Sequence, residues 1–275
     1  MQKTVTLKEF QKDLLDIFAE FHNYCVENKL TYYMIGGTLL GAVRENGFIP
    51  WDDDIDVAMP RPDYERFVNN YSGAFCLHSL KNNKKHMFPY VKLFHGTTPV
   101  VRVEDEDFNF HASVFSKIDI YPIDGLSNND YKAIKHFNKV NRAKHLLFLN
   151  LSKAKSKSSL KNAILRLISL IPARLILKNI DKKMRKYSYE TSEYLTRWRE
   201  GGKEPNIVKK EVFGNPKAFA FEEYVFWGPE HSEEYLTSVY GDYMTRVQVN
   251  GGPRHNSNEN AITEKLESDL TQKHV

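Results

Sequence analysis

The chain has 275 residues, with 39 Lys and Arg against 35 Asp and Glu, and its formal net charge is +4. With 41% hydrophobic, 27% charged and 13% aromatic residues, the composition is that of a folded globular protein and excludes disordered and fibrous classes. Its 2 cysteines, Cys25 and Cys76, are too few for a disulfide scaffold or a Cys-rich zinc site and fit a reducing compartment.

The N-terminal stretch predicts a helix over residues 7–28. Phe10, Leu14 and Phe18 recur at helical spacing, and Thr6 followed by Glu9 forms a capping box. No apolar signal region precedes this helix, so we expect a cytoplasmic protein.

The remainder of the first half predicts a mixed α/β arrangement. A buried strand at 30–35 ends at a Gly-Gly pair, and a short helix follows from 38 to about 45. Residues 54–59 alternate acidic and apolar side chains over their first four positions and predict a strand with both carboxylates on one face. Further strands are expected at 75–79, 88–94, 98–103 and 114–121, with a helix at about 62–70.

The second half predicts mostly helix from residue 130 to about 198, with a break at Pro172. The apolar stretch at 163–171 is shorter than the roughly 20 residues that cross a bilayer. Helix is expected again near 231–239, and the tail from about residue 257 is polar.

The small net charge hides an asymmetry. Residues 131–188 hold 16 Lys and Arg and a single acidic residue, Asp181, whereas the rest of the chain is acidic. Such a segment suits an anionic partner, and it equally suits a solvated helix pair whose apolar side packs on the rest of the protein.

The block from Ile35 to Val57 carries the predicted chemistry. Gly36 and Gly37, between a strand and a helix, let the backbone approach a ligand, and the helix N-terminus attracts phosphate. About 18 residues downstream, Asp54 and Asp56 lie one strand step of about 7 Å apart, close enough to share hard divalent cations.

A third carboxylate, Asp119, lies in an otherwise apolar strand, where an unpaired charge is costly. A metal shared with Asp54 and Asp56 would neutralise it, and the alternative is a buried ion pair with Lys or Arg. Asp124, at the following turn, favours a structural role.

These motifs resemble one known family. The order Gly-Gly, Leu-Leu-Gly-Ala-Val-Arg, Trp-Asp-Asp-Asp-Ile-Asp-Val and Ile-Asp-Ile-Tyr-Pro-Ile-Asp-Gly is similar to that of the LicD family of phosphocholine transferases, relatives of the fukutin proteins. Tyr-Gly-Asp-Tyr-Met at 240–244 resembles the closing motif of that family. The resemblance covers about residues 10–256 and implies a nucleotidyltransferase-like mixed sheet with flanking helices, an α/β (α+β) fold.

The resemblance implies the division of the chain and its site. A catalytic core at 1–128, the basic helical segment at 129–200, a part at 201–256 that packs back on the core and a flexible tail at 257–275 are expected. It implies the following site residues: metal ligands and catalytic carboxylates Asp54, Asp56 and Asp119, and a phosphate cradle of Gly36, Gly37 and Thr38.

Three further residues are candidates on weaker grounds. Arg44 and Lys92 could contact phosphate or acceptor. Arg44 could equally pair with Glu45 or Asp52, and the alternation around Lys92 favours an outward-facing, solvated lysine. Trp51 could stack on a base or sugar, or pack beside the Pro50 turn.

The implied reaction is the transfer of a phospho-alcohol group, phosphocholine foremost, from a CDP-linked donor to a hydroxyl of a cell-surface glycan, with release of CMP. Mg²⁺, or Mn²⁺ in its place, would assist.

The acceptor would be lipid-linked, and the basic segment at 131–188 could hold the enzyme to the inner face of the membrane. Nucleic acid is not an expected partner, since no recognition motif accompanies the charge. The alternatives are a nucleotidyltransferase acting on another acceptor such as RNA, and an inactive nucleotide-binding domain.

Overall fold

The computed structural model describes residues 4–96, 100–103, 111–152, 158–198 and 206–245. The predicted tail at 257–275 and the end of the predicted C-terminal part, 246–256, lie outside this range. In chain order the elements are β1 (Thr4–Val5), α1 (Leu7–Glu27), β2 (Tyr33–Met34), α2 (Gly36–Glu45), β3 (Ile55–Pro60), α3 (Arg61–Asn70), β4 (Cys76–His78), β5 (Val91–Phe94), β6 (Val100–Val103), β7 (His111–Val114), β8 (Lys117–Gly125), α4 (Asp130–Ser152), α5 (Ser159–Ser169), α6 (Ala173–Met184), β9 (Tyr194–Arg197), β10 (Ile207–Lys209), α7 (Lys210–Phe213), β11 (Lys217–Phe221), β12 (Tyr224–Gly228) and α8 (Ser232–Tyr240).

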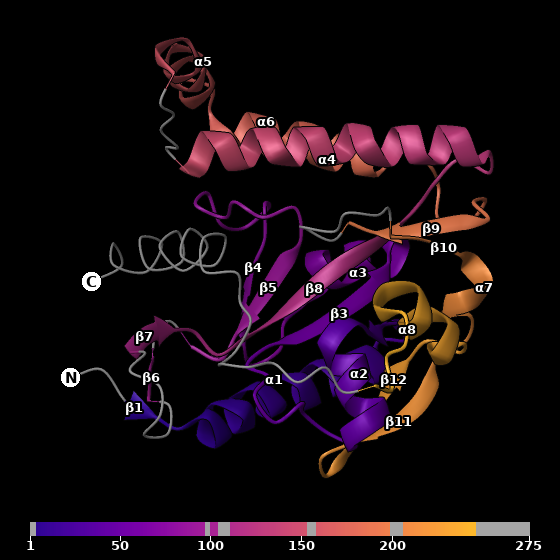
Figure 1. Cartoon of the computed structure of the whole chain (residues 1–275). Coiled ribbons are helices and arrows are strands. Elements are labelled where there is room, and N and C mark those ends of the chain that lie inside the picture. The colour runs from indigo at the N-terminus through magenta and orange to yellow at the C-terminus, as the bar shows by residue number, and fades with distance from the viewer. Residues whose placement is uncertain (1–3, 97–99, 104–110, 153–157, 199–205, 246–275) are drawn as a thin grey trace.

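A mixed sheet forms the centre of the fold (Figure 1). Strand β8 runs through its middle and pairs in parallel with β3 on one side. On its other side β8 pairs antiparallel with β5 along its first half and with β9 at its end. Strand β2 extends the sheet beyond β3, β10 extends it beyond β9, and β4 pairs with β5. The expected mixed α/β fold is confirmed.

Helix α1 shows how the sequence pattern becomes packing. Its start has the predicted capping box, in which the Thr6 hydroxyl accepts a hydrogen bond from the Glu9 N–H and the Glu9 carboxylate accepts one from the Thr6 N–H. The apolar side buries Phe10, Leu14 and Phe18 in the main core. Burial of this face holds the helix along the sheet, since helical propensity alone stabilises little.

The basic segment is a helical hairpin of α4 and α6 that lies along one end of the sheet, with α5 at its far end (Figure 1). These helices have a second core of their own, which includes Phe137, Leu177 and Trp198. Lys144, in the middle of α4, donates to the Trp198 carbonyl at 2.6 Å and so joins the hairpin to the end of β9. Along the described ranges, no helix has the length and apolar character that crossing a bilayer requires.

Several stretches differ from the sequence prediction: β1, β10 and α7 form where no element was predicted, the strand expected at 114–121 is divided between β7 and β8, and two larger differences follow. Residues 194–197, expected to be helical, form β9, because their backbone groups complete the free edge of β8. Residues 217–228 form the hairpin of β11 and β12, for which no element was predicted. Its turn contains Glu222 at φ +52° and no glycine, so the usual hairpin signal is missing from the sequence.

Candidate active site

Three charged side chains meet in register on one face of the sheet. Asp56 of β3 lies directly opposite Asp119 of β8, and Asp119 lies directly opposite Lys92 of β5. Residues directly opposite each other in a sheet point to the same face, with their β-carbons about 5 Å apart. The structure therefore brings two of the predicted carboxylates, and one predicted phosphate contact, into one row across three strands.

The loop before β3 adds two more carboxylates, Asp52 and Asp54. Burial and the nearby charge of Asp54 raise the pKa of Asp52 to about 9. Burial, with the charges of Asp54 and Asp119, raises the pKa of Asp56 to about 8. Sequence reasoning missed Asp52, although the Asp52-Asp53-Asp54 run was visible. Burial is the larger cause of both raised pKa values and the neighbouring carboxylates add to it, so ionising this group of side chains without a cation is costly.

Asp119 has such a cation in Lys92. The Lys92 ammonium lies 3.0 and 3.1 Å from the two carboxylate oxygens, and its Nζ lies 4.3 Å from the centre of the Phe88 ring. Burial alone would raise the pKa of Asp119, but the charges of Lys92 and Lys117 lower it below the usual value. The prediction of a solvated Lys92 was wrong, because its side chain is only 2% exposed. The buried ion pair considered for Asp119 is present.

The Gly-Gly pair allows α2 to start against the carboxylates. Gly36 has φ +58°, a conformation that favours glycine, and a β-carbon there would lie 3.5 Å from the Asp56 carboxylate. At Gly37 a β-carbon would lie 2.9 Å from Oδ2 of Asp52, closer than real β-carbons come to other atoms. The two glycines thus let the first turn of α2 approach both acidic side chains.

Thr38 connects the same turn to β3. Its hydroxyl accepts a hydrogen bond of 2.9 Å from the Asp56 N–H, and the residue is 2% exposed. The observed contact of Thr38 is therefore with the backbone of a predicted metal ligand, whose position it fixes.

Arg197, which the sequence analysis missed, is the second buried cation at this site. It lies opposite Ile123 of β8, on the same face as Asp119, and is 3% exposed. Its terminal nitrogens lie 3.6 and 3.7 Å from where a β-carbon of Gly36 would be. Its positive charge offsets part of the rise in the pKa of Asp56 that burial and the neighbouring carboxylates cause. Its Nε has no hydrogen-bond partner among the described residues. The expectation of helix around residue 197 hid this residue, since a strand alone places it on the sheet face.

Three other residues discussed from sequence lie apart from this row. Arg44 donates to the Tyr243 carbonyl at 3.1 Å and lies 3.7 Å from Glu45, so it connects α2 to the segment after α8. Trp51 is 45% exposed, which argues against a packing role.

Asp124 has the structural role expected of it, although it lies within β8 and not at the turn that the sequence predicted. It is 1% exposed and accepts two hydrogen bonds of 2.6 Å from Arg61 and one of 2.6 Å from the Trp198 indole. All of these partners lie within the fold, so its carboxylate serves to join α3 and β9 to β8.

The donor set fits a hard divalent cation. Asp52, Asp54, Asp56 and Asp119 offer only carboxylate oxygens, the ligands that Mg²⁺ and Mn²⁺ prefer. A bound cation would also relieve the repulsion that raises the pKa of Asp56. The described residues at this face therefore offer the type of ligand that the expected metal prefers, but no three of their ligand atoms lie within 4.8 Å of one another in the described part of the chain, so binding would require these carboxylates to move closer together.

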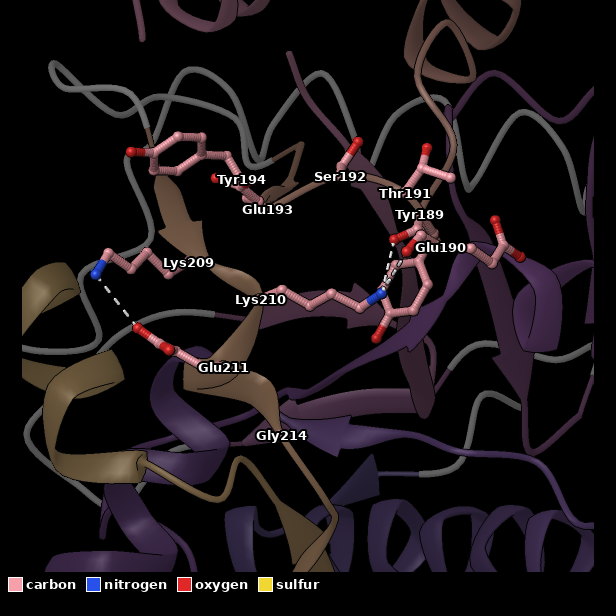
Figure 2. A pocket seen from close by; sticks show the side chains of 10 residues that line it. All are labelled: Tyr189, Glu190, Thr191, Ser192, Glu193, Tyr194, Lys209, Lys210, Glu211 and Gly214. Carbon is pink, nitrogen blue, oxygen red and sulfur yellow. Dashed lines mark hydrogen bonds and ion pairs between the residues drawn. The ribbon is translucent and has the colours of Figure 1, made fainter. Parts of the chain in front are cut away.

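A separate cavity of about 690 Å³ lies beside β9, β10 and α7 (Figure 2). Its lining contains none of the predicted site residues. Lys210 donates to the carbonyls of Tyr189 and Glu190, and Lys209 lies 3.3 Å from Glu211. Both lysines thus have partners in the wall of the cavity. The cavity is distinct from the carboxylate row, because the two share no residue.

Comparison with known proteins identifies the family of the chain. Residues 29–157 match the family described as LicD/FKTN/FKRP, nucleotidyltransferase domain. The chain is 32% identical over 252 residues to the lipopolysaccharide cholinephosphotransferase LicD of Haemophilus influenzae, with 88% of this chain and 92% of that protein covered. It is also 39% identical over 54 residues to an uncharacterized protein of Rickettsia typhi, covering 20% of this chain and 18% of that one. The matched family domain contains Asp54, Asp56, Asp119 and Lys92. The chain belongs to the LicD family.

Proposed function

We propose that this protein transfers phosphocholine from a CDP-linked donor to a hydroxyl of a cell-surface glycan, such as a lipopolysaccharide, teichoic acid or capsular polysaccharide, and releases CMP. The observation that carries the proposal is the register of Asp56 with Asp119 on parallel strands beside Gly36. The relative in Haemophilus influenzae is named as a lipopolysaccharide cholinephosphotransferase, and the alignment covers 92% of it.

In the proposed reaction, the acceptor hydroxyl oxygen forms a bond to the phosphorus of phosphocholine while the bond from that phosphorus to the CMP oxygen breaks. The hydroxyl proton leaves to a nearby base, and CMP departs with the bonding electrons. Mg²⁺ held by Asp54, Asp56 and Asp119 would supply positive charge for the diphosphate and the leaving CMP.

The different pKa values of Asp119 and Asp52 suit these carboxylates to different roles. Because Lys92 and Lys117 lower the pKa of Asp119, this side chain stays ionised at neutral pH and is a weak base. A ligand role suits it better than proton removal from the acceptor. Asp52, whose pKa is raised, is the stronger base in the same cluster.

We assign Arg197 to the donor diphosphate. Its guanidinium lies beside Gly36, on the carboxylate face, with an unpaired Nε among the described residues. Guanidinium groups bind phosphate oxygens through paired N–H donors that a lysine cannot reproduce. Arg197→Lys keeps the charge but loses that fork, so the KM for CDP-choline should rise more than kcat falls. Loss of kcat at unchanged KM would contradict this role.

The decisive experiment measures CMP release from CDP-choline by the purified protein with Mg²⁺, and then with a panel of CDP-alcohols and nucleoside triphosphates. Asp56→Asn should lower the rate by at least about 100-fold, because the proposed Mg²⁺, which would offset the charge of the transferred phosphate, loses one of its carboxylate ligands. Glu223→Gln, the same chemical change at an exposed position, is the control. Full activity of Asp56→Asn would refute the proposal. Pyrophosphate release from a nucleoside triphosphate, without CMP release from any CDP-alcohol, would favour the nucleotidyltransferase alternative.

A further inference from the structure

Helix α5 presents an apolar side to solvent. Leu160 is 71% exposed and Leu167 is 66% exposed, and Ile164 between them is 49% exposed. None of the residues of α5 is buried. The feature continues past the helix, where Leu170 is 76% exposed and Leu175, in α6, is 59% exposed.

The exposed side chains form a stripe. Leu160, Ile164 and Leu167 follow one another at intervals of four and three residues, which places them on one face of α5, and the exposed Leu170 and Ile171 follow just after the helix ends. Leu165 and Ile168 lie along one edge of this stripe, turned toward the protein, and are half-buried. The helix thus has one apolar side directed to the protein and another directed away from it.

The orientation of this stripe is fixed by α4. The side-chain amide of Asn150 donates to the carbonyl of Ile168 at 2.6 Å and to that of Ile171 at 2.9 Å. Asn150 is itself 9% exposed, so these bonds are shielded from water. Helix α5 lies at the end of the hairpin of α4 and α6, away from the central sheet (Figure 1). The stripe is therefore held at an outer end of the molecule.

Positive charge borders the stripe. Lys161 and Arg166 are exposed on α5, and Lys178 and Lys182 are exposed on α6. The whole segment 131–188 has 16 Lys and Arg and one acidic residue. An apolar helix face bordered by basic side chains is the pattern of helices that lie in the plane of an anionic bilayer.

We propose that α5 and the turn into α6 dock on an anionic phospholipid bilayer. Leu160, Ile164 and Leu167 enter the boundary between headgroups and acyl chains, and Lys161 and Arg166 contact the anionic headgroups. Charge decides between a bilayer and a second copy of the chain. A symmetric dimer through this face would place two such basic borders against each other, whereas an anionic leaflet complements them.

Vesicle flotation of the full-length protein tests this surface, with phosphatidylcholine vesicles that contain or lack phosphatidylglycerol. The test variant is Leu160→Ser with Leu167→Ser. The control is Val26→Ser with Val225→Ser, which removes exposed apolar side chains of 46% and 55% exposure on α1 and β12. Circular dichroism and thermal unfolding of both variants check that they fold, and light scattering without lipid gives the oligomeric state.

We expect the wild type to float with phosphatidylglycerol vesicles and not with phosphatidylcholine alone, and to bind less as NaCl rises. The test variant should bind at least about tenfold more weakly than the wild type, because it lacks two leucine side chains that would leave water on binding. The control should bind as the wild type does.

Absence of wild-type binding to either vesicle, or equal binding by the test variant, overturns the proposal. A wild-type dimer that the test variant converts to a monomer would assign the stripe to a second copy instead. A test variant that unfolds at a lower temperature than the control would show that the stripe belongs to the core, which also overturns the proposal.

Discussion

Replacing Lys92 by methionine tests the charge balance at the carboxylate face most directly. Methionine has nearly the length of lysine but carries no charge, so the change removes the ammonium that lies 3.0 and 3.1 Å from the Asp119 oxygens. The Lys92 side chain is 2% exposed, and water cannot readily take its place. Asp119 would then be left beside Asp56, with Lys117 as the remaining cation whose charge lowers its pKa.

The expected cost follows from this burial. Removing one partner of a buried ion pair destabilises a protein by about 3–5 kcal/mol, because the remaining charge is uncompensated. The Asp119 side chain is 15% exposed and keeps Lys117 nearby, so we expect the lower end, about 3 kcal/mol at pH 8 without metal. Adding Asp119→Asn removes the stranded charge, and the double variant should recover at least about 1 kcal/mol of that loss.

Urea unfolding followed by tryptophan fluorescence gives the free energies for wild type, Lys92→Met and the double variant. Lys8→Met, at an exposed lysine, is the matched control and should lie within about 0.5 kcal/mol of the wild type. Mg²⁺ should restore part of the stability of Lys92→Met, since a cation at the carboxylates replaces the missing charge. The reasoning is refuted if Lys92→Met is as stable as Lys8→Met, or if the double variant is less stable than Lys92→Met.

Three other changes probe the same face and its supports. Thr38→Val leaves the Asp56 N–H without its acceptor and should cost about 1–3 kcal/mol in urea unfolding, whereas Thr38→Ser should cost less; equal losses would contradict the hydrogen bond. Asp124→Asn removes the 2.6 Å carboxylate partner of the buried Arg61, which keeps only its longer ion pairs with Glu65 at 3.4 Å and Asp181 at 3.6 Å, and should destabilise by about 3 kcal/mol. CMP release per folded molecule should stay normal, and a specific loss of kcat would give Asp124 a role in the reaction. Because the folded-state pKa of Asp56 is raised from 3.8 to about 8, the metal-free protein should lose stability as pH rises from about 4 to 8, and Mg²⁺ should raise the unfolding temperature more at pH 8.5 than at pH 5.5; an equal Mg²⁺ effect at both pH values would contradict the cluster.

Local sequence patterns identified the elements that carry the carboxylates. The alternation of Asp54, Ile55, Asp56 and Val57 predicted a strand with both acids on one face. Strand β3 begins at Ile55, so it carries Asp56 beside Asp119, whereas Asp54 lies in the loop before it. The Gly-Gly pair predicted a strand-to-helix turn, and Gly36 adopts the positive φ that such a turn uses. These predictions depend on backbone geometry within a few residues, which the local sequence determines.

The partners of those carboxylates could not be predicted in the same way. Alternation places Lys92 and its neighbours on opposite faces of β5, but it does not say which face is covered. In the structure the Phe88 ring and Asp119 cover Lys92, and both come from outside β5. Arg197 joins the site because β9 completes the edge of β8, a pairing across more than 70 residues that no local pattern records.

The turn between β11 and β12 is a second feature that depends on residues distant in sequence. Glu222 adopts φ +52° without being glycine or asparagine. Its N–H donates to the Asn46 carbonyl at 2.7 Å, and its carboxylate accepts from the Phe48 N–H at 3.0 Å. These bonds come from the end of α2, so the conformation is stabilised by a segment distant in sequence.

The sequence by itself thus determined the mixed α/β class, the Gly36 turn and the strand that carries Asp56, because each depends on neighbouring residues. Only the tertiary structure decided that Lys92 is buried against Asp119, that Arg197 lies beside Gly36 and that the stripe on α5 faces solvent. Each of these depends on which side of an element another part of the chain covers. That choice is set by packing across the whole fold, and local periodicity carries no record of it.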